Sequence, residues 1–238
     1  MREPTLQIFA IDGIGEVRPG DDLSGILATA ISSLDGFGLA TGDVVVVTSK
    51  VVSKAEGRLV EVAGDGASKV ALVESEAVRI LRRRGELLIT ETRHGFVCAN
   101  AGVDLSNVEE GSAVLLPLDP DRSARRLRAD LGRSLGVEVA IIISDTFGRA
   151  WRNGVIDVAI GCAGIAGIID LRGTLDANGR VLEATEVCVV DELASAADLV
   201  MGKATNVPAV VIRGARREWL RDGAVAEVIR APGEDMFR

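Results

Sequence analysis

Four consecutive valines constrain the fold of this chain more than any other feature of its sequence. They lie within the segment Asp43–Ser49, and a continuous β-branched run without polar alternation indicates a strand that is buried on both faces. The surrounding core must also be aliphatic, because apolar residues make up 47% of the chain whereas aromatic residues make up 3% and tyrosine is absent. The sequence therefore predicts a sheet with an aliphatic interior.

Strand and helix signals alternate along the rest of the chain. We expect further strands at Leu6–Ile11, Leu87–Thr92, Phe96–Ala99, Val137–Ile143 and Pro208–Ile212. Apolar spacing and capping residues predict helices from Asp21 or Asp22 to about Leu34, Ser68–Arg84, Ser123–Leu135 and Thr185–Met201. The Gly- and Ala-rich run at residues 155–168 fits a helix or a strand. A mixture of one hairpin and isolated strands favours an α+β fold with mixed sheets and flanking helices.

Length and charge restrict the function classes. A chain of 238 residues forms one sizeable core, or two lobes that share one, so we predict a single domain over residues 1–238. The net charge of −8 argues against nucleic-acid binding. The sequence has neither a signal peptide nor an apolar stretch of membrane-spanning length, and its three dispersed cysteines are typical of reduced thiols. We therefore expect a cytoplasmic protein without a membrane partner.

The segment SDTFGRAWRNG, residues 144–154, is the strongest candidate for chemistry. Asp145 and Thr146 follow a predicted buried strand, and strand carboxyl ends commonly carry ligand sites. A carboxylate next to a hydroxyl suits Mg²⁺ or Mn²⁺. Arg149 and Arg152 are spaced to grip phosphates or carboxylates. An ordinary turn with solvated arginines explains the segment equally well when it is taken alone.

Two other segments carry polar residues suited to a nucleotide site. Asp104 and Asn107 lie three residues apart in NAGVDLSNVEEG, although Asp, Asn and Gly are also the usual turn formers. Ser49 and Lys54 lie in TSKVVSKAEGR and could donate to phosphates, although this segment lacks the Walker A spacing and a solvated strand end is the alternative. Spacing alone does not show that these distant segments meet.

Other candidates are weaker. His94 is the only histidine in the chain, which excludes histidine-rich metal sites, and it fits a hairpin turn. The cysteines lack zinc spacing. The glycines at 161, 164 and 167 favour close packing over a phosphate-binding fingerprint.

Taken together, four segments resemble one family. They are GDVVVVTSKVVSKAEGR, CANAGVDLSNVEEG, SDTFGRAWRNGVIDVAIG and MGKATNVPAVVIRG, and they resemble the coenzyme F420-0:γ-glutamyl ligases from about Ile8 to Gly214. The resemblance implies a homodimer with a two-lobed mixed fold. It also implies a reaction that uses GTP and a divalent cation to add L-glutamate to coenzyme F420-0. Many actinobacterial relatives carry a C-terminal flavin-reductase-like domain, which we do not expect in these 238 residues.

The resemblance also assigns site residues by position. It implies metal ligands at Asp104, Asp145 and Thr146, for Mg²⁺ or Mn²⁺, and leaves a monovalent cation open. It implies nucleotide contacts in four places, which are Ile14, Gly15, Glu16 and Val17; Ser49 and Lys54; Asn107; and Met201, Gly202, Lys203, Ala204, Thr205, Asn206 and Val207. The late loop departs from the family, because Lys203 stands where archaeal members carry a further metal-binding carboxylate.

These assignments lead to a mechanistic hypothesis. The γ-phosphoryl group of GTP passes to a carboxylate of the coenzyme, and the amine of glutamate then displaces phosphate from the acyl phosphate. Lys54, with Arg149 or Arg152, offsets the negative charge. The alternatives are a metal-dependent phosphohydrolase, a ligase for another γ-glutamyl acceptor such as a folate, and a nucleotide-binding regulatory module without catalysis.

Overall fold

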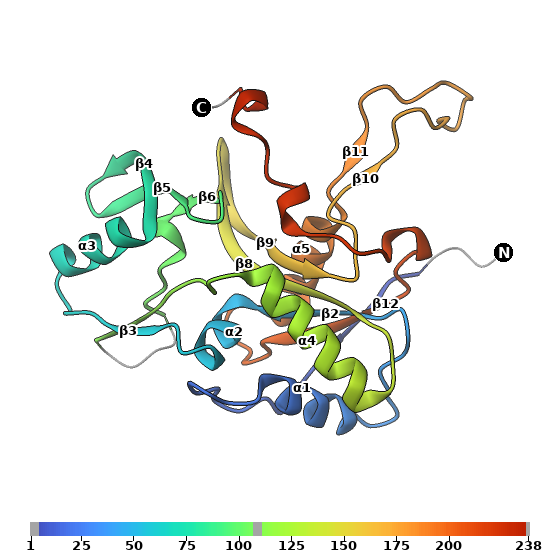
Figure 1. Cartoon of the computed structure of the whole chain (residues 1–238), viewed down its shortest axis with the longest axis horizontal. Coiled ribbons are helices and arrows are strands. Elements are labelled where there is room, and N and C mark those ends of the chain that lie inside the picture. The colour runs from blue at the N-terminus through green and yellow to red at the C-terminus, as the bar shows by residue number, and fades with distance from the viewer. Residues whose placement is uncertain (1–4, 107–110, 237–238) are drawn as a thin grey trace.

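A five-stranded mixed sheet organises the protein (Figure 1). The computed structural model describes residues 5–106 and 111–236. In this part of the chain the strand order of the large sheet is β1-β12-β2-β8-β9. The strands are β1 (Gln7–Ala10), β12 (Ala209–Arg213), β2 (Val44–Thr48), β8 (Ala140–Arg149) and β9 (Arg152–Ala163). Only β2 and β8 run parallel to each other, and the other neighbouring pairs are antiparallel.

Helices cover both faces of this sheet (Figure 1). On one face, Val45 and Val47 of β2 pack in a core with α1 (Leu23–Ser32) and α4 (Pro120–Leu135). On the other face, Val44 and Val46 pack against α5 (Val189–Met201). All four valines have no exposed surface, and burying each side chain contributes about 1.5–3 kcal/mol. The prediction of a strand buried on both faces is confirmed.

Helix α4, the longest helix among the described residues, has a capping residue at each end. The side chain of Asp119 accepts a hydrogen bond from Arg122 N, and Pro120 occupies the first turn, where it suits the helical backbone. Gly136 ends the helix in the left-handed conformation at φ 68°. The predicted helix Ser123–Leu135 is therefore present and begins three residues earlier, at Pro120.

A smaller part of the protein has its own apolar cluster, formed by residues such as Val73, Leu88 and Ala113. Its elements are β3 (Leu59–Glu61), α3 (Gly66–Glu76), β4 (Ala77–Arg84), β5 (Leu87–Thr92), β6 (Val97–Ala99), the 3₁₀ turn η1 (Asn100–Gly102) and β7 (Ser112–Val114). The remaining elements are α2 (Ser49–Ala55), β10 (Ile169–Asp170), β11 (Glu186–Val187) and the 3₁₀ turns η2 (Arg217–Trp219), η3 (Val225–Glu227) and η4 (Pro232–Glu234).

The prediction of one helix from Ser68 to Arg84 is wrong in its second half. Helix α3 ends at Glu76, and the chain continues as strand β4, which pairs with β5 in an antiparallel hairpin. Gly85 turns the hairpin at φ 60°, a conformation that glycine adopts without steric cost. Arg82–Arg84 therefore lie in a solvent-facing strand and not at the C-terminal end of a helix. The hairpin predicted from Leu87–Thr92 and Phe96–Ala99 is confirmed as β5 and β6.

Two further boundaries differ from the predictions. The strand predicted to end at Ile143 continues to Arg149, and the ambiguous run at residues 155–168 is largely strand β9, which pairs with β8 along most of its length. These two strands form an extended ribbon (Figure 1). Helix α5 begins at Val189 rather than Thr185, because Glu186–Val187 is strand β11.

The fold class is α+β with mixed sheets and flanking helices, as the sequence predicts. The structure does not clearly divide the chain into two lobes. Within the described residues, no helix combines the length and apolar character that a membrane crossing requires. All three cysteines are free thiols, of which Cys98 and Cys162 are buried and Cys188 is partly buried.

The three regularly spaced glycines serve close packing, as expected. A Cβ atom added at Gly161 would lie 2.5 Å from the backbone of Pro120 at the start of α4. We expect Gly161→Ala to lower the free energy of unfolding by about 1–3 kcal/mol, because β9 and α4 would have to separate. Gly148→Ala is the matched control, since its Cβ would meet no atom within 4 Å. Urea denaturation of both variants tests this, and equal stabilities would contradict it.

Candidate functional site

A cavity of about 890 Å³ lies at the carboxyl ends of the two parallel strands. Its walls come from the turn after β1, the start of α2, the loop after η1, the ribbon β8–β9 and the end of α5. Segments that are far apart in the sequence therefore meet at one place. All four motifs singled out from the sequence contribute residues to the lining of this cavity.

The parallel pairing of β2 and β8 aligns the first two site residues. Thr48 lies opposite Ser144 in the sheet, so the residues that follow them lie side by side, Ser49 at the start of α2 and Asp145 within β8. Ser49 Oγ donates a hydrogen bond to Asp145 Oδ1 over 2.7 Å. The contact fixes the orientation of the carboxylate toward the cavity.

The surroundings of the Asp145 carboxyl group offer little positive charge to compensate its ionisation. Burial, together with the neighbouring carboxylates of Asp157 and Asp104, raises its pKa to about 7. The hydrogen bonds from Ser49 and from the backbone of Thr146 act in the opposite direction and do not offset these effects. A cation placed beside Asp145 would relieve this unfavourable crowding.

Asp104 reaches the cavity from the smaller part of the protein. Its backbone pairs with Val114 in an isolated antiparallel bridge, which holds the loop after η1 in place. Asp104 Oδ2 lies 2.7 Å from Lys50 Nζ, and Oδ1 accepts a hydrogen bond from Ser106 N. Although burial acts against it, the hydrogen bonds from Lys50 and Ser106 hold the pKa of Asp104 below its usual value. Asp104 is therefore ionised at neutral pH.

A second lysine of α2 is buried beside the same cavity. The side chain of Lys54 is 7% exposed, and its Nζ atom forms an ion pair of 2.5 Å with Glu16 Oε1. Glu16 lies in the turn after β1 and is mostly exposed. The pair ties this turn to α2, and it keeps an ammonium group at the cavity wall.

Lys203 forms the densest charge cluster of the cavity. Its ammonium group lies 2.8 Å from Thr146 Oγ1, 2.8 Å from Asp157 Oδ1 and 2.5 Å from Asp198 Oδ1. Thr146 in turn donates a 2.6 Å hydrogen bond to Asp157. Although burial lowers it, the hydrogen bonds to Asp157 and Asp198 raise the pKa of Lys203 above its usual value.

Most of the residues predicted from the sequence meet at this cavity. The lining includes Ile14, Gly15, Glu16, Val17, Ser49, Lys54, Asp104, Asp145, Thr146, Met201, Gly202, Lys203, Asn206 and Val207. Ala204 and Thr205 belong to the same loop and are not part of the lining, and the hydroxyl of Thr205 donates to Met201 O. Asn107 lies outside the described residues.

The two predicted catalytic arginines are not brought to this cavity. Arg149 and Arg152 face each other where β8 turns into β9, and both are exposed. The strand extension past Asp145 carries them away, because each residue of a strand advances the chain by about 3.3 Å. The sequence prediction ended the strand at Ile143 and did not foresee its extension to Arg149.

Sequence reasoning missed two acidic residues of the cavity. Asp157 lies opposite Thr146 in the ribbon, and its side chain is 3% exposed. Asp198 lies in the last turn of α5. The sequence contained a signal for Asp157, which is the single charge within the apolar run at residues 155–168. An isolated charge in a buried strand must be paired, and therefore indicates a site.

The residues present fit a divalent cation that also binds a substrate. Among the described residues, no group of three or more His, Cys, Asp and Glu side chains could hold a metal ion by itself. Asp104 and Asp145 line one cavity and offer carboxylate oxygens, which are the ligands Mg²⁺ and Mn²⁺ prefer. Because Mg²⁺ commonly takes one or two protein carboxylates together with phosphate oxygens, this donor set fits a metal–nucleotide complex.

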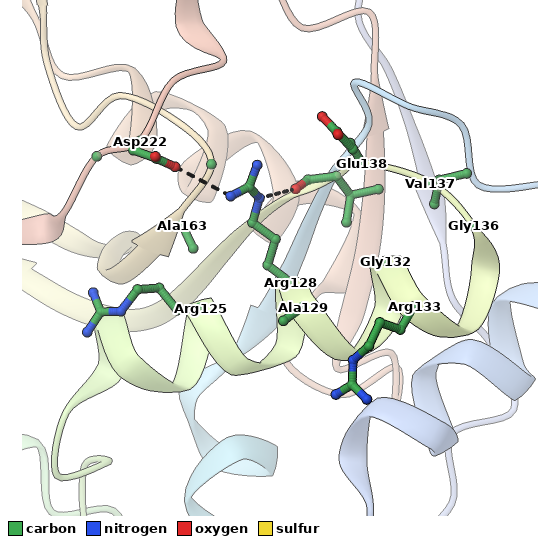
Figure 2. A pocket seen from close by; sticks show the side chains of 13 residues that line it. Arg125, Arg128, Ala129, Gly132, Arg133, Gly136, Val137, Glu138, Ala163 and Asp222 are labelled. Atoms are coloured by element: carbon green, nitrogen blue, oxygen red, sulfur yellow. Dashed lines mark hydrogen bonds and ion pairs between the residues drawn. The ribbon is translucent and has the colours of Figure 1, made fainter.

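A second cavity, of about 620 Å³, lies between α4, the segment that leads into β8, the end of β9 and the segment around Asp222 (Figure 2). Arg128 extends across it, donates to Val139 O over 2.9 Å and pairs with Asp222 at 3.4 Å. Its lining contains none of the residues predicted for metal or nucleotide binding. We therefore assign the candidate site to the larger cavity.

A cavity that gathers acidic and basic side chains at the carboxyl ends of parallel strands is typical of an enzyme site for small anionic substrates. Comparison with known proteins defines the class further. The family described as F420-0:Gamma-glutamyl ligase matches residues 13–214. The chain belongs to this ligase family.

Curated relatives extend the match over nearly the whole chain. The protein named Coenzyme F420:L-glutamate ligase from Methanothermobacter thermautotrophicus is 42% identical over 98% of this chain and 99% of its own length. The proteins of the same name from Methanopyrus kandleri and Archaeoglobus fulgidus are 43% and 38% identical, over 99% and 98% of this chain and 98% and 96% of their own lengths. The resemblance predicted from the four motifs is confirmed.

The raised pKa of Asp145 predicts a pH-dependent cost to stability. In its folded state the carboxyl group titrates near pH 7, whereas in the unfolded chain it titrates near pH 4. As the pH rises between these values, ionisation of Asp145 therefore lowers the free energy of unfolding, and the full decrease is reached above pH 7. In the presence of a chelator, Asp145→Asn should raise the unfolding temperature relative to the wild type.

The increase in unfolding temperature of Asp145→Asn over the wild type should be small at pH 4.5 and should grow until about pH 8. Thermal unfolding of both chains across this range measures it, with Asp35→Asn at an exposed position as the control. A gain for Asp145→Asn that stays constant with pH would contradict the prediction.

Proposed function

We propose that this chain is a GTP-dependent and divalent-metal-dependent ligase that adds L-glutamate to coenzyme F420-0. The family membership supports a ligase, and the names of the relatives specify coenzyme F420 and L-glutamate for those proteins. The observation that carries the proposal is the shared cavity of Asp104 and Asp145. These carboxylates come from distant segments and face one space together with Ser49 and Lys54.

Asp104 and Asp145 would hold Mg²⁺ or Mn²⁺ together with phosphate oxygens of GTP. When bound, the ion neutralises charge on the phosphate groups and so makes phosphoryl transfer easier. Thr146, the third predicted ligand, already contacts a cation, because Lys203 Nζ lies 2.8 Å from its hydroxyl oxygen. The two carboxylates are therefore the primary candidates for ligands.

The protein groups around the cavity would bind and orient the nucleotide. Lys54 holds an ammonium group at the wall, where it can exchange its contact with Glu16 for a phosphate oxygen. The turn at residues 14–17 and five residues of the loop at residues 201–207 line the cavity and would contact the nucleotide. The chain thus contributes by positioning and by electrostatic stabilisation.

The reaction would proceed in two balanced steps. A terminal carboxylate oxygen of the coenzyme attacks the γ-phosphorus of GTP, the bond to the bridging oxygen breaks, and GDP leaves. The glutamate amine then attacks the acyl carbon, the carbon–oxygen bond to phosphate breaks, and an amide and inorganic phosphate form. The amine loses its proton in this step. Activation is needed because a carboxylate oxygen is a poor leaving group.

Three other functions predict different products from the same cavity. A metal-dependent phosphohydrolase would release phosphate from GTP without glutamate or coenzyme. A ligase for another acceptor, such as a folate, would extend that acceptor in preference to coenzyme F420-0. A regulatory module would bind GTP and form no product.

We expect the protein, incubated with coenzyme F420-0, GTP, Mn²⁺ and L-glutamate, to increase the mass of the coenzyme by glutamyl units. Asp145→Ala should lower turnover on the order of a hundredfold or more, because it removes a ligand of the ion. Asp35→Ala, at an exposed position, is the control. Mass spectrometry of the products and circular dichroism of each variant provide the readouts. Full activity of Asp145→Ala in the folded state would overturn the metal assignment.

We also propose that the chain forms a homodimer, and the tip of the β8–β9 ribbon supports this. Trp151 is 82% exposed and Val155 is 56% exposed, and large exposed apolar groups of this kind often mark contact surfaces. We expect light scattering to give twice the mass of the chain, and Trp151→Glu to shift the protein toward the monomer. Ser32→Glu on α1, an exposed polar position, is the control. A monomeric wild type would overturn the proposal.

A further inference from the structure

We infer that the ammonium group of Lys203 is a built-in cation that takes the place of a second metal ion at this site. The inference rests on the proposed function, because it concerns how many ions accompany the nucleotide. It gives a different role to Lys203, a predicted nucleotide contact, and to Thr146, a predicted metal ligand, and it gives a first role to Asp157 and Asp198.

The surroundings of Lys203 Nζ resemble a cation-binding shell made of hard oxygens. Two carboxylate oxygens and one hydroxyl oxygen lie 2.5–2.8 Å from the nitrogen. These are the oxygen types that also bind Mg²⁺ and Mn²⁺. The ammonium group therefore occupies the point where the oxygens converge, and a second ion would have to displace it.

Three separate elements build this shell. Thr146 and Asp157 lie directly opposite each other in β8 and β9, so their side chains share one face of the ribbon. Asp198 comes from the last turn of α5. Ser195 Oγ of that helix donates to Asp157 O over 2.7 Å, and so holds α5 against β9. The shell is therefore fixed by the fold and does not depend on a flexible surface side chain alone.

Buried Asp157 makes a cation at this point necessary. Its side chain is 3% exposed, and Ser144 Oγ and Thr146 Oγ1 each donate a hydrogen bond to it. Two neutral hydroxyl groups leave the charge of a buried carboxylate uncompensated. Lys203 supplies the missing positive charge at 2.8 Å.

The backbone directs Lys203 back toward the ribbon. Gly202 follows the last residue of α5 with φ 61° and ψ 179°, a conformation that is essentially restricted to glycine. The next residue is therefore directed past the C-terminal end of the helix, where positive charge is favourable. Because the ammonium group is covalently attached to the chain through the Lys203 side chain, it stays in the site, whereas a metal ion would exchange with solvent.

A divalent ion and an ammonium group could not share this small shell, because like charges at such short range repel strongly. The wild type should therefore bind the ion at Asp104 and Asp145 and no other. Removal of the ammonium group should leave three oxygen ligands open. Replacement of Lys203 by a carboxylate should add a fourth ligand and create a second site.

The test counts Mn²⁺ ions per chain by equilibrium dialysis and electron paramagnetic resonance, with β,γ-imido-GTP at saturation. We expect Lys203→Glu to bind one Mn²⁺ more than the wild type. Lys203→Arg keeps the positive charge and should bind the wild-type number. Lys69→Glu makes the same change of charge on α3 and should also leave the number unchanged. The added ion should be lost again in Lys203→Glu combined with Asp198→Asn.

The two proposals fail in different ways in this experiment. The difference between Lys203→Glu and the wild type tests the built-in cation, and the wild-type number tests metal dependence. An equal number of ions in Lys203→Glu and the wild type would overturn the inference. So would an extra ion in Lys203→Arg, or two ions in the wild type. A wild type that binds no Mn²⁺ with the nucleotide would overturn the proposed metal dependence, whatever Lys203→Glu does.

Discussion

The parallel contact between β2 and β8 is the constraint on which the site depends. Every other neighbouring pair in the large sheet is antiparallel, so this is the one pair in the sheet whose strands run in the same direction. The register places Thr48 opposite Ser144, and the residues that follow them, Ser49 at the start of α2 and Asp145 in β8, carry site side chains. A shift of one residue in this register would move Ser49 out of line with Asp145, and the hydrogen bond between them would be lost. The register between β2 and β8 therefore fixes the geometry of the site.

The charges around the cavity form pairs that a substrate can rearrange. Lys50 pairs with Asp104, Lys54 with Glu16, and Lys203 with Asp157 and Asp198. Asp145 accepts a hydrogen bond from a neutral hydroxyl, which lowers its pKa, but burial outweighs this effect and raises the pKa to about 7. The site is thus least balanced at Asp145, next to the parallel strand ends. This imbalance favours the entry of a cation there, and a cation in turn attracts phosphate groups.

The sequence predicted elements and residues whose signal is local. The valine run, the β5–β6 hairpin and the glycine end of α4 were predicted correctly because each has its own propensity or turn signal. Asp145 was proposed because it follows a predicted strand, and Asp104 because its motif resembles that of the family; the structure places both on one cavity. Asp198 was missed because a single acid in an amphipathic helix is normally solvated, and only the packing of α5 against β9 brings it to the cavity.

The misplaced arginines show how strand length determines which residues can act together. Four residues of extended chain separate Asp145 from Arg149, a distance of about 13 Å, whereas a tight turn would have kept them neighbours. The chain cannot form such a turn after Asp145, because β9 pairs with β8 as far as Arg149 and holds this stretch extended. The same pairing places Asp157 opposite Thr146, near the base of the ribbon. A segment that looked like one catalytic loop therefore separates into two parts. Its base faces the cavity, and its tip presents Trp151 to solvent.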